Sequence, residues 1–415
     1  MTQRLSDNSR GRSGVTFGEG YQASGVAAGI KPSGAKDLCV LLSERPAVVA
    51  GAFTANRVAA ATVAYDRDIV AGGAPVRAVV VNSGNANAAT GANGMADTVT
   101  MAECVAAHVG VSSNEVLVSS TGKIGVPLPM SAVQTGIAAA CDRLAASGGP
   151  DAAEAIMTTD TVPKAAQIEL DIEGRRVRLG GMAKGAGMIA PHLIPAAVPH
   201  ATMLAYLTTD AAVERDFLQQ CLCESLDRSF NRITIDGDCS TNDTFLALAN
   251  GAAGNSPLTA RHPAAEAFAA AFADVAASLA RQIVLDAEGA TRFVEVVVQG
   301  ARDSEHARKC AAKIANSMLC KTAWFGGDPN WGRIIDAAGY SGADLDAEGM
   351  SLDYGDTPVV RNGVDAGTPA EELARAVAGP ELRVRLDLGV GAGSFTMWTC
   401  DLSYEYVRIN AEYST

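Results

Sequence analysis

The sequence predicts a mixed α/β protein built of layers of strands and helices. Short apolar runs with the alternation typical of β-strands recur along the 415 residues, and longer segments with helical spacing separate them. Hydrophobic residues make up 48% of the chain and charged residues 19%, so a chain of this length can bury a large core. The sequence contains neither a Walker phosphate loop nor a GxGxxG turn that opens a helix, the two usual signatures of a nucleotide-binding sheet.

In the first half of the chain, strands alternate with two helices. Residues 1–14 are polar and predict a disordered tail, and residues 43–46 (Ser-Glu-Arg-Pro) form a turn between two strands. Glu173-Gly174 is the predicted turn of a hairpin. The predicted strands are 38–42, 48–53, 77–81, 115–119, 167–172 and 177–179, and the predicted helices are 97–108 and 130–146.

The second half repeats this mixture. A long Ala-rich segment, 264–285, has the clearest helical spacing. The predicted strands are 202–207, 244–249, 293–298, 382–388 and 394–400, and the further predicted helices are 214–228 and 304–319.

Charge and hydropathy exclude several classes of partner. The formal net charge of −13 disfavours binding to nucleic acid or to anionic lipid, and no basic run offsets it. No continuous apolar stretch reaches the roughly 18 residues that span a bilayer, and the N-terminus has no apolar signal segment. We therefore expect a cytoplasmic protein.

The cysteines and histidines show no metal or disulfide pattern. The nine cysteines are an odd number without a regular framework, which indicates buried thiols in a reducing compartment. Cys221 and Cys223 have the wrong spacing for a Cys-x-x-Cys pair. None of the five histidines falls in a recognisable triad or metal-ligand spacing, so we expect no metal site.

One block of the chain carries the chemistry. Lys184 opens the run Lys-Gly-Ala-Gly-Met-Ile-Ala-Pro, and Ala201-Thr202-Met-Leu follows nine residues later. Thr202 taken alone is most simply a residue at the start of a strand, since β-branched residues favour strands. A Thr at a new N-terminus is different, because its α-amine, with a pKa near 8, can take the proton of its own hydroxyl.

This block belongs to a series of motifs that resembles the ornithine acetyltransferase family, the bifunctional glutamate N-acetyltransferases. The motifs follow the family order over nearly the whole chain, which makes coincidence implausible although each is short. They are 25–31 (GVAAGIK), 53–56 (FTAN), 82–87 (NSGNAN), 120–125 (STGKIG), 157–160 (MTTD), 229–232 (SFNR), 236–243 (DGDCSTND), 325–333 (FGGDPNWGR) and 410–413 (NAEY).

The resemblance implies a fold and a reaction. The fold is a layered sandwich with helices flanking two stacked sheets, as in the DmpA-like aminopeptidase group. The chain cuts itself between Ala201 and Thr202 into an α chain (15–201 after the tail) and a β chain (202–415). Thr202 is then the nucleophile that moves acetyl from N-acetylornithine to glutamate in arginine biosynthesis, and Thr121 and Gly122 form the oxyanion hole.

The resemblance also implies the substrate contacts. Glu288 can pair with the ornithine ammonium, while Lys, Thr and Asn donors can hold a carboxylate. As isolated residues these would more often be structural. No cofactor is implied, and the expected assembly has two α and two β chains. The implied substrate-binding residues are Thr159, Lys184, Thr202, Glu288, Asn410 and Thr415.

The sequence departs from the family pattern at two places. Lys123 stands where an aliphatic residue is usual, so either the pocket is altered or Lys123 points to solvent, as Lys more commonly does. Residues 192–200 lengthen the segment before the cleavage site, and Pro195 and Pro199 disfavour a helix there. This insertion bears on the rate of self-cleavage and on access to the pocket.

Several alternatives stay open at this point. The chain could be a self-processed amide hydrolase or aminopeptidase, a homologue serving a secondary-metabolite pathway, or a non-catalytic binding protein. Acetyl-CoA is a second donor for some family members. We interpret residues 328–333 as a turn with a packed Trp331, and residues 82–87 as a loop near the site.

Overall fold

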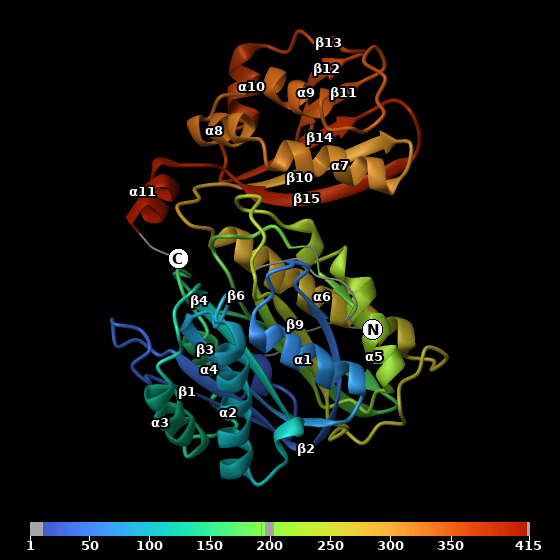
Figure 1. The fold of residues 1–415 in the computed structure, drawn as a ribbon. Helices are drawn as coiled ribbons and strands as arrows, with labels where there is room; N and C mark the ends of the chain where they lie inside the picture. Colours follow the sequence, from blue (N-terminus) through green and yellow to red (C-terminus); the bar gives the residue numbers. More distant parts are fainter. Residues whose placement is uncertain (1–10, 192, 196–202, 413–415) are drawn as a thin grey trace. The chain divides into compact units, whose positions relative to one another are not determined.

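A computed structural model describes residues 11–191, 193–195 and 203–412 and divides the chain into two compact units (Figure 1). The first unit comprises the residues up to Asn231 together with Cys239–Ile283, and the second comprises Arg232–Asp238 and the residues after Ile283. Each unit has its own mixed sheet with helices packed on it. The predicted mixed α/β class is confirmed.

The first unit is built on a sheet in which nine strands of the described chain take part. Its central path is β4-β3-β2-β9-β8-β6-β5, with β1 and β7 also paired to β2. The predicted hairpin is confirmed as the antiparallel pair of β5 and β6. The strands are β1 (Tyr21–Val26), β2 (Leu38–Phe53), β3 (Val76–Asn85), β4 (Val116–Lys123), β5 (Lys164–Ile172), β6 (Arg175–Lys184), β7 (Ile194–Pro195), β8 (Leu204–Thr209) and β9 (Thr244–Ala249).

The long strand β2 folds this sheet onto itself. Its first part pairs with β1 and β3, and its second part, Val48–Phe53, pairs with β9. The sequence predicted two strands and a turn at residues 43–46, but the strand continues with a register shift between Leu42 and Ala47. A β-bulge therefore accommodates the turn-forming residues, including Pro46, without ending the strand.

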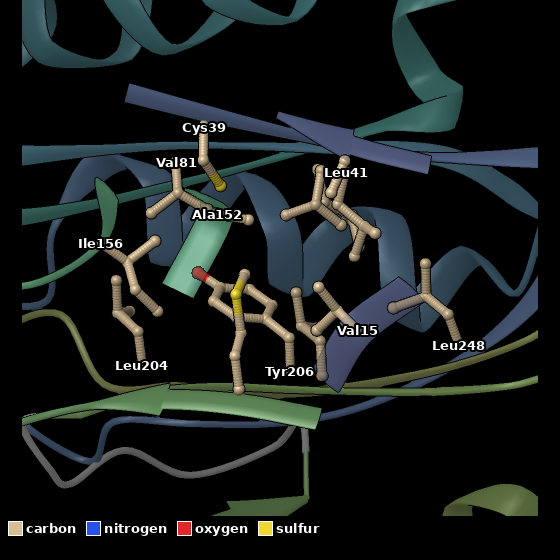
Figure 2. Packing of buried hydrophobic residues seen from close by; sticks show 14 of the residues in the cluster. Val15, Cys39, Leu41, Val81, Ala152, Ile156, Leu204, Tyr206 and Leu248 are labelled. Atoms are coloured by element: carbon tan, nitrogen blue, oxygen red, sulfur yellow. The ribbon is translucent and has the colours of Figure 1, made fainter. Parts of the chain in front are cut away.

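The two halves of the folded sheet pack face to face. Tyr206 of β8 lies against Cys39 and Val81 of the other layer, and all three are fully buried (Figure 2). Helices α2 and α3 cover the outer face of β3 around Val80. On the other layer, Phe245 of β9 lies 6.1 Å, centroid to centroid, from Phe272 of α6. The predicted arrangement of helices flanking two stacked sheets is thus confirmed.

Six α-helices of the described chain lie wholly or mainly in this unit. The predicted helices at 97–108, 130–146, 214–228 and 264–285 are all confirmed with shifted ends, whereas the helices at 61–72 and 149–155 were not predicted. The helices are α1 (Ala61–Gly72), α2 (Gly91–Val109), α3 (Met130–Cys141), α4 (Gly149–Ala155), α5 (Arg215–Leu226) and α6 (Ala265–Leu285), and short 3-10 turns occur at Gly14–Thr16, Ser113–Glu115 and Phe230–Arg232.

Helix α6 is long and apolar enough, by length and composition alone, to cross a membrane. No continuous apolar run predicted this, because the hydropathy is an average over many alanines interrupted by Glu266, Asp274 and Arg281. Phe268 and Phe272 are buried, as expected for a core helix. We therefore interpret α6 as part of the core of the first unit.

The predicted disordered tail, 1–14, is too long, because the folded part of the chain includes residues before 15. Arg12 donates hydrogen bonds to the carbonyl oxygens of Thr16, Gly18 and Tyr21 at 3.0–3.3 Å. Gly14 already belongs to a 3-10 turn. Residues 11–14 are consequently part of the first unit, and residues 1–10 lie outside the described chain.

The second unit is a six-stranded sheet, in the order β13-β12-β11-β14-β10-β15, around its own apolar core. Among the strands that the structure describes in this unit, β10 and β14 pair in parallel and the other pairs are antiparallel. The predicted helix 304–319 is two helices, because the Ser317 side chain caps a new one. The elements are β10 (Phe293–Ala301), β11 (Ser351–Tyr354), β12 (Thr357–Arg361), β13 (Val364–Asp365), β14 (Glu381–Asp387), β15 (Gly393–Cys400), α7 (Ser304–Ala315), α8 (Met318–Gly326), α9 (Trp331–Gly339), α10 (Ala370–Ala376) and α11 (Tyr404–Glu412).

The 328–333 motif begins a helix, where we had interpreted a turn. The Asn330 side chain accepts a hydrogen bond from the Arg333 amide and so caps α9. Trp331 packs against the core of the second unit, as expected. The motif therefore has a structural role in this unit.

Candidate active site

The ammonium group of Lys184 is the centre of the site that the first unit forms. Lys184 is the last residue of β6 and only 4% exposed. Its Nζ donates to Thr158 Oγ1 at 2.7 Å and to Thr121 Oγ1 at 3.3 Å. Two residues that we selected from separate motifs, Lys184 and Thr121, are thereby brought into direct contact.

Thr121 and Gly122 lie near the end of β4 and are held in a tight backbone pairing with β3. Thr121 pairs with Ser83 and Gly122 with Gly84 of β3. Gly122 has φ +131°, and an added Cβ would lie 2.3 Å from the Gly84 carbonyl carbon. Only glycine fits at this position, because the backbones of β4 and β3 approach each other closely there. Lys123, the next residue, is exposed, which agrees with the prediction that it points to solvent.

A second contact to this end of β4 comes from Asn242, which lies just before β9. The Asn242 side chain donates to the carbonyl oxygens of Ser120 at 2.8 Å and of Ala86 at 2.5 Å. Sequence reasoning recognised residues 236–243 as a motif but missed this role. The only signal in the sequence was an Asn two residues before a predicted strand, and this does not reveal a contact with a residue 122 positions away.

The asparagine-rich segment 82–87, at the end of β3, supports the same part of β4. Asn82 accepts a hydrogen bond from the Ser120 hydroxyl at 2.6 Å and donates to the Asn85 carbonyl at 2.9 Å. Asn85 donates to the carbonyls of Val126 and Pro127. The predicted loop is therefore wrong for residues 82–85, which end β3, and only residues 86 and 87 lie beyond the strand. These asparagines shape the backbone beside Thr121 and Gly122.

Asp160 is the counter-ion of the site. Its buried carboxylate accepts from Lys164 Nζ at 2.6 Å, from the Gly185 amide at 2.7 Å and from the Thr158 amide at 2.9 Å. Burial favours a raised pKa, but the ammonium groups of Lys184 and Lys164, with the Gly185 amide, lower the pKa of Asp160 to about 2. Asp160 is therefore ionised; it binds Lys164 directly and interacts electrostatically with Lys184.

Thr159 lies next to these groups without being the partner of Lys184. The hydroxyl that binds Lys184 in this loop belongs to Thr158, and Thr159 is half-buried beside it. The implied contact of Thr159 with substrate stays a prediction.

The β-sheet register places the start of β8 beside Lys184. Leu204 pairs with Lys184 of β6 on one side and with Thr244 of β9 on the other. The Thr244 amide donates to the Met203 carbonyl at 2.8 Å. Ala201 and Thr202, the predicted cleavage site and nucleophile, lie outside the described residues, as do Thr415 and most of the 192–200 insertion. The two described residues Ile194 and Pro195 form β7, so the backbone is extended there, as predicted.

The second unit brings together two other predicted residues. Asn410 of α11 donates to Glu288 Oε2 at 2.8 Å. Tyr406, one turn earlier, donates its hydroxyl to Asp236 at 3.2 Å. Burial and the carboxylate of Asp236 raise the pKa of Tyr406 well above its ordinary value. Glu288 and Asn410 therefore form one polar group in this unit.

One cluster on the first unit looks like a triad but cannot act as one. Ser256 Oγ lies 3.0 Å from His262 Nε2, and Glu173 Oε1 lies 3.2 Å from the same nitrogen. His262 Nδ1 accepts the Ala264 amide at 3.0 Å, so in neutral His262 the proton is on Nε2. Such an imidazole cannot accept the Ser256 proton at Nε2, and a triad places the acid on the other ring nitrogen.

Comparisons with known proteins give a consistent result. A family model described as the ArgJ family matches residues 22–415. A Synechococcus protein named arginine biosynthesis bifunctional protein ArgJ is 45% identical over 411 residues, covering 97% of both chains. A Geobacter sulfurreducens protein of the same name is 47% identical over 398 residues, covering 96% of this chain and 99% of its own.

Two solved structures carry related descriptions. The arginine biosynthesis bifunctional protein ArgJ of Bacillus halodurans is 40% identical and covers 50% of this chain and 97% of its own, with a TM-score of 0.48. Ornithine acetyltransferase from Mycobacterium tuberculosis, complexed with ornithine, is 45% identical and covers 46% of this chain and 100% of its own, with a TM-score of 0.42. The family match and the sequence identities over almost the full length show that this chain belongs to the ArgJ family.

Proposed function

We propose that this protein is an ornithine acetyltransferase of arginine biosynthesis that cuts its own backbone before Thr202. The released Thr202 then carries acetyl from N-acetylornithine to glutamate. The observation that supports this most directly is the buried contact between Lys184 and Thr121 beside the start of β8. It joins an oxyanion donor and a cation in one site, next to the strand that the proposed nucleophile begins.

Self-cleavage in this proposal is an N-to-O acyl shift followed by hydrolysis. The Thr202 hydroxyl oxygen attacks the Ala201 carbonyl carbon, and the peptide C–N bond breaks as the nitrogen gains the proton. Water then hydrolyses the resulting ester to give the Ala201 carboxylate and free Thr202. The α-amine produced in this way serves as the base of the later reaction.

Acetyl transfer proceeds in two balanced halves. Thr202 attacks the acetyl carbonyl of N-acetylornithine while its α-amine takes the hydroxyl proton, and that proton passes to the leaving nitrogen as the C–N bond breaks. Glutamate then attacks the acetyl ester, and the Thr202 oxygen regains a proton as the C–O bond breaks. The Thr121 hydroxyl and the Gly122 amide stabilise the negatively charged oxygen in both halves. Donors that the sheet already holds in place need no reorganisation to do this.

Charge distribution agrees with amino-acid substrates. Lys184, hydrogen-bonded to Thr158 and near the charge of Asp160, provides a cation for a substrate carboxylate close to Thr121. In the second unit the Glu288 carboxylate, oriented by Asn410, suits the side-chain ammonium of ornithine. Thr159 and Thr415 complete the proposed set of substrate contacts. The proposed acetyl transfer uses groups of the chain and its two substrates.

The proposal extends to the assembly and to the donor range. We place the enzyme in the cytoplasm, with two α chains (15–201) and two β chains (202–415) in one complex. Acetyl-CoA is proposed as an additional donor, which would make the enzyme bifunctional. Both points rest on the family, and native mass measurement and an acetyl-CoA assay test them.

Incubation with N-acetylornithine, with and without glutamate, tests the proposed reaction. With glutamate, ornithine and N-acetylglutamate should form in equal amounts, and initial rates should follow ping-pong kinetics. Without glutamate, ornithine release should stop after one equivalent per site. Continuous release of ornithine and acetate at the same rate without glutamate would instead identify a hydrolase.

A further inference from the structure

Asp243, the residue before β9, is a fully buried carboxyl group with an unusual environment. It is 0% exposed, and neither carboxyl oxygen receives a hydrogen bond from any residue that the structure describes. Its backbone is well anchored, since the Thr54 amide donates to its carbonyl at 2.8 Å. A buried carboxyl without a partner is costly, which makes a functional reason for keeping it worth seeking.

Another buried aspartate provides the contrast within the same unit. Asp66 of α1 is also 0% exposed, but its Oδ1 accepts the Val118 amide at 2.7 Å. That contact ties α1 to β4 and gives Asp66 a structural role. No such bond exists for the Asp243 side chain in the described part of the chain.

The position of Asp243 links it to the proposed reaction centre. It directly precedes Thr244, which pairs with Leu204 and whose amide binds the Met203 carbonyl. It directly follows Asn242, which binds the Ser120 carbonyl beside Thr121. Residues adjacent in sequence are only about 3.8 Å apart, Cα to Cα. The backbone of Asp243 therefore lies between the start of β8 and the end of β4 that carries Thr121.

Burial raises the pKa of Asp243 well above its ordinary value of 3.8, and the ammonium of Lys184 lowers it by less. Lys184 is the charged group that acts on Asp243 among the described residues, and Asp160 in turn is coupled to Lys184. Burial therefore disfavours the charged form of this carboxyl group. An ammonium group newly formed next to it would favour the ionised form.

We propose that Asp243 is a positioning residue for acetyl transfer, which receives the ammonium group that forms on the α-amine of Thr202. This rests on the proposed self-cleavage before Thr202. When the amine takes the hydroxyl proton, it becomes an ammonium ion, and the Asp243 carboxylate stabilises that charge and holds the amine in place. The carboxylate makes no bond to substrate.

The test compares Asp243→Asn with wild type, and Asp66→Asn serves as the matched control. Asp243→Asn should still cut itself, because no α-amine exists before cleavage. Its kcat for acetyl transfer should fall roughly ten- to a hundredfold, which corresponds to the loss of one charge-assisted contact. The acidic midpoint of its kcat/KM profile should move to lower pH, because an amine without a neighbouring carboxylate is less basic.

The outcomes separate this inference from the proposed function. If wild type neither cleaves nor transfers acetyl, the proposed function fails. If wild type does both and Asp243→Asn retains the wild-type midpoint and kcat, the inference alone fails. Loss of cleavage in Asp243→Asn with retained fold would also overturn it, since Asp243 would then act earlier. Asp66→Asn should leave the midpoint unchanged, and an equal shift there would contradict a specific role.

A second measurement needs only the wild-type enzyme and remains decisive if Asp243→Asn does not fold. The pKa of the new α-amine can be read from its pH-dependent labelling with 13C-formaldehyde and a borohydride reductant. We expect it to lie above the ordinary value of about 8. A value at or below that would contradict a carboxylate partner.

Discussion

The ammonium nitrogen of Lys184 lies 3.3 Å from the hydroxyl oxygen of Thr121, and both side chains are buried. Lys184 ends β6 and Thr121 lies near the end of β4, at positions far apart in the sheet order. The contact places a positive charge next to the hydroxyl that we assign to the oxyanion hole. Donors to a developing oxyanion contribute most when they are fixed in advance, as this pair is.

Thr121→Ala should lower kcat for acetyl transfer about a hundredfold with little change in KM for N-acetylornithine. The reason is that one oxyanion donor contributes roughly 3 kcal/mol in the transition state alone. Thr158→Ala is the matched control, because it removes the other hydroxyl bound to Lys184. Steady-state kinetics of the cleaved variants measure both. An effect of Thr158→Ala on kcat as large as that of Thr121→Ala would contradict the assignment.

Lys184→Met should impair both half-reactions, since N-acetylornithine and glutamate each present a carboxylate. Methionine keeps most of the side-chain volume and removes the charge. We expect kcat/KM for donor and acceptor to fall by at least roughly tenfold each, as for loss of a charge-assisted bond. Separate rates of ornithine release and N-acetylglutamate formation test this, and a defect confined to one substrate would argue against a shared carboxylate site.

Asp160→Asn should destabilise the first unit by about 3–5 kcal/mol, because it leaves the buried Lys164 ammonium without this carboxylate. Glu154→Gln is the control, since its pair with Lys36 is exposed and contributes at most about 1 kcal/mol. Urea unfolding of the variants and wild type measures the difference.

The Asp160 contribution also has a defined pH dependence. The folded-state pKa is lowered from 3.8 to about 2, so the unfolded chain takes up the proton first as the pH falls. Wild type should therefore exceed Asp160→Asn in stability by the full amount above pH 3.8, and the difference should shrink as pH falls toward about 2. A difference that grows with acidification would contradict the ion-pair account.

Glu288→Gln should reduce kcat/KM for N-acetylornithine roughly ten- to a hundredfold through loss of one charge-assisted contact. Self-cleavage needs no ornithine and should proceed normally. Glu405→Gln is the control, because that exposed carboxylate pairs with Arg408 on the outside of α11. Near-wild-type kinetics of Glu288→Gln and Lys184→Met together would favour the hydrolase alternative.

Much of the fold could be predicted because its signals are local. The alternation of residues 167–179 around Glu173-Gly174 predicted the β5–β6 hairpin. In the structure both turn residues have a positive φ, as this type of hairpin turn requires. The period of residues 264–285 gave α6. Local signals failed where one side chain decides the boundary: Ser317 divides a predicted helix, and Asn330 begins one at a predicted turn. In β2 the turn-forming residues 43–46 do not end the strand, because β1 and β3 pair with it on its two sides and a bulge accommodates these residues.

The site could be predicted only in part for a similar reason. Lys184 and Thr121 were found because each lies in a recognisable motif, and Glu288 and Asn410 for the same reason. The roles of Thr158, Asp160, Asn242 and Asp243 depend on which strands are neighbours in the folded sheet, and sequence spacing does not contain that information.

The central claim is that Thr202 is the nucleophile exposed by self-cleavage. The most direct measurement is the intact mass and N-terminal sequence of the purified protein, for wild type and Thr202→Ala, alongside the acetyl-transfer rate of each. We predict two wild-type fragments, the larger beginning Thr-Met-Leu-Ala, and an uncut, inactive alanine variant. An intact 42.5 kDa chain in a fully active wild-type preparation, or acetyl transfer by Thr202→Ala, would contradict the account.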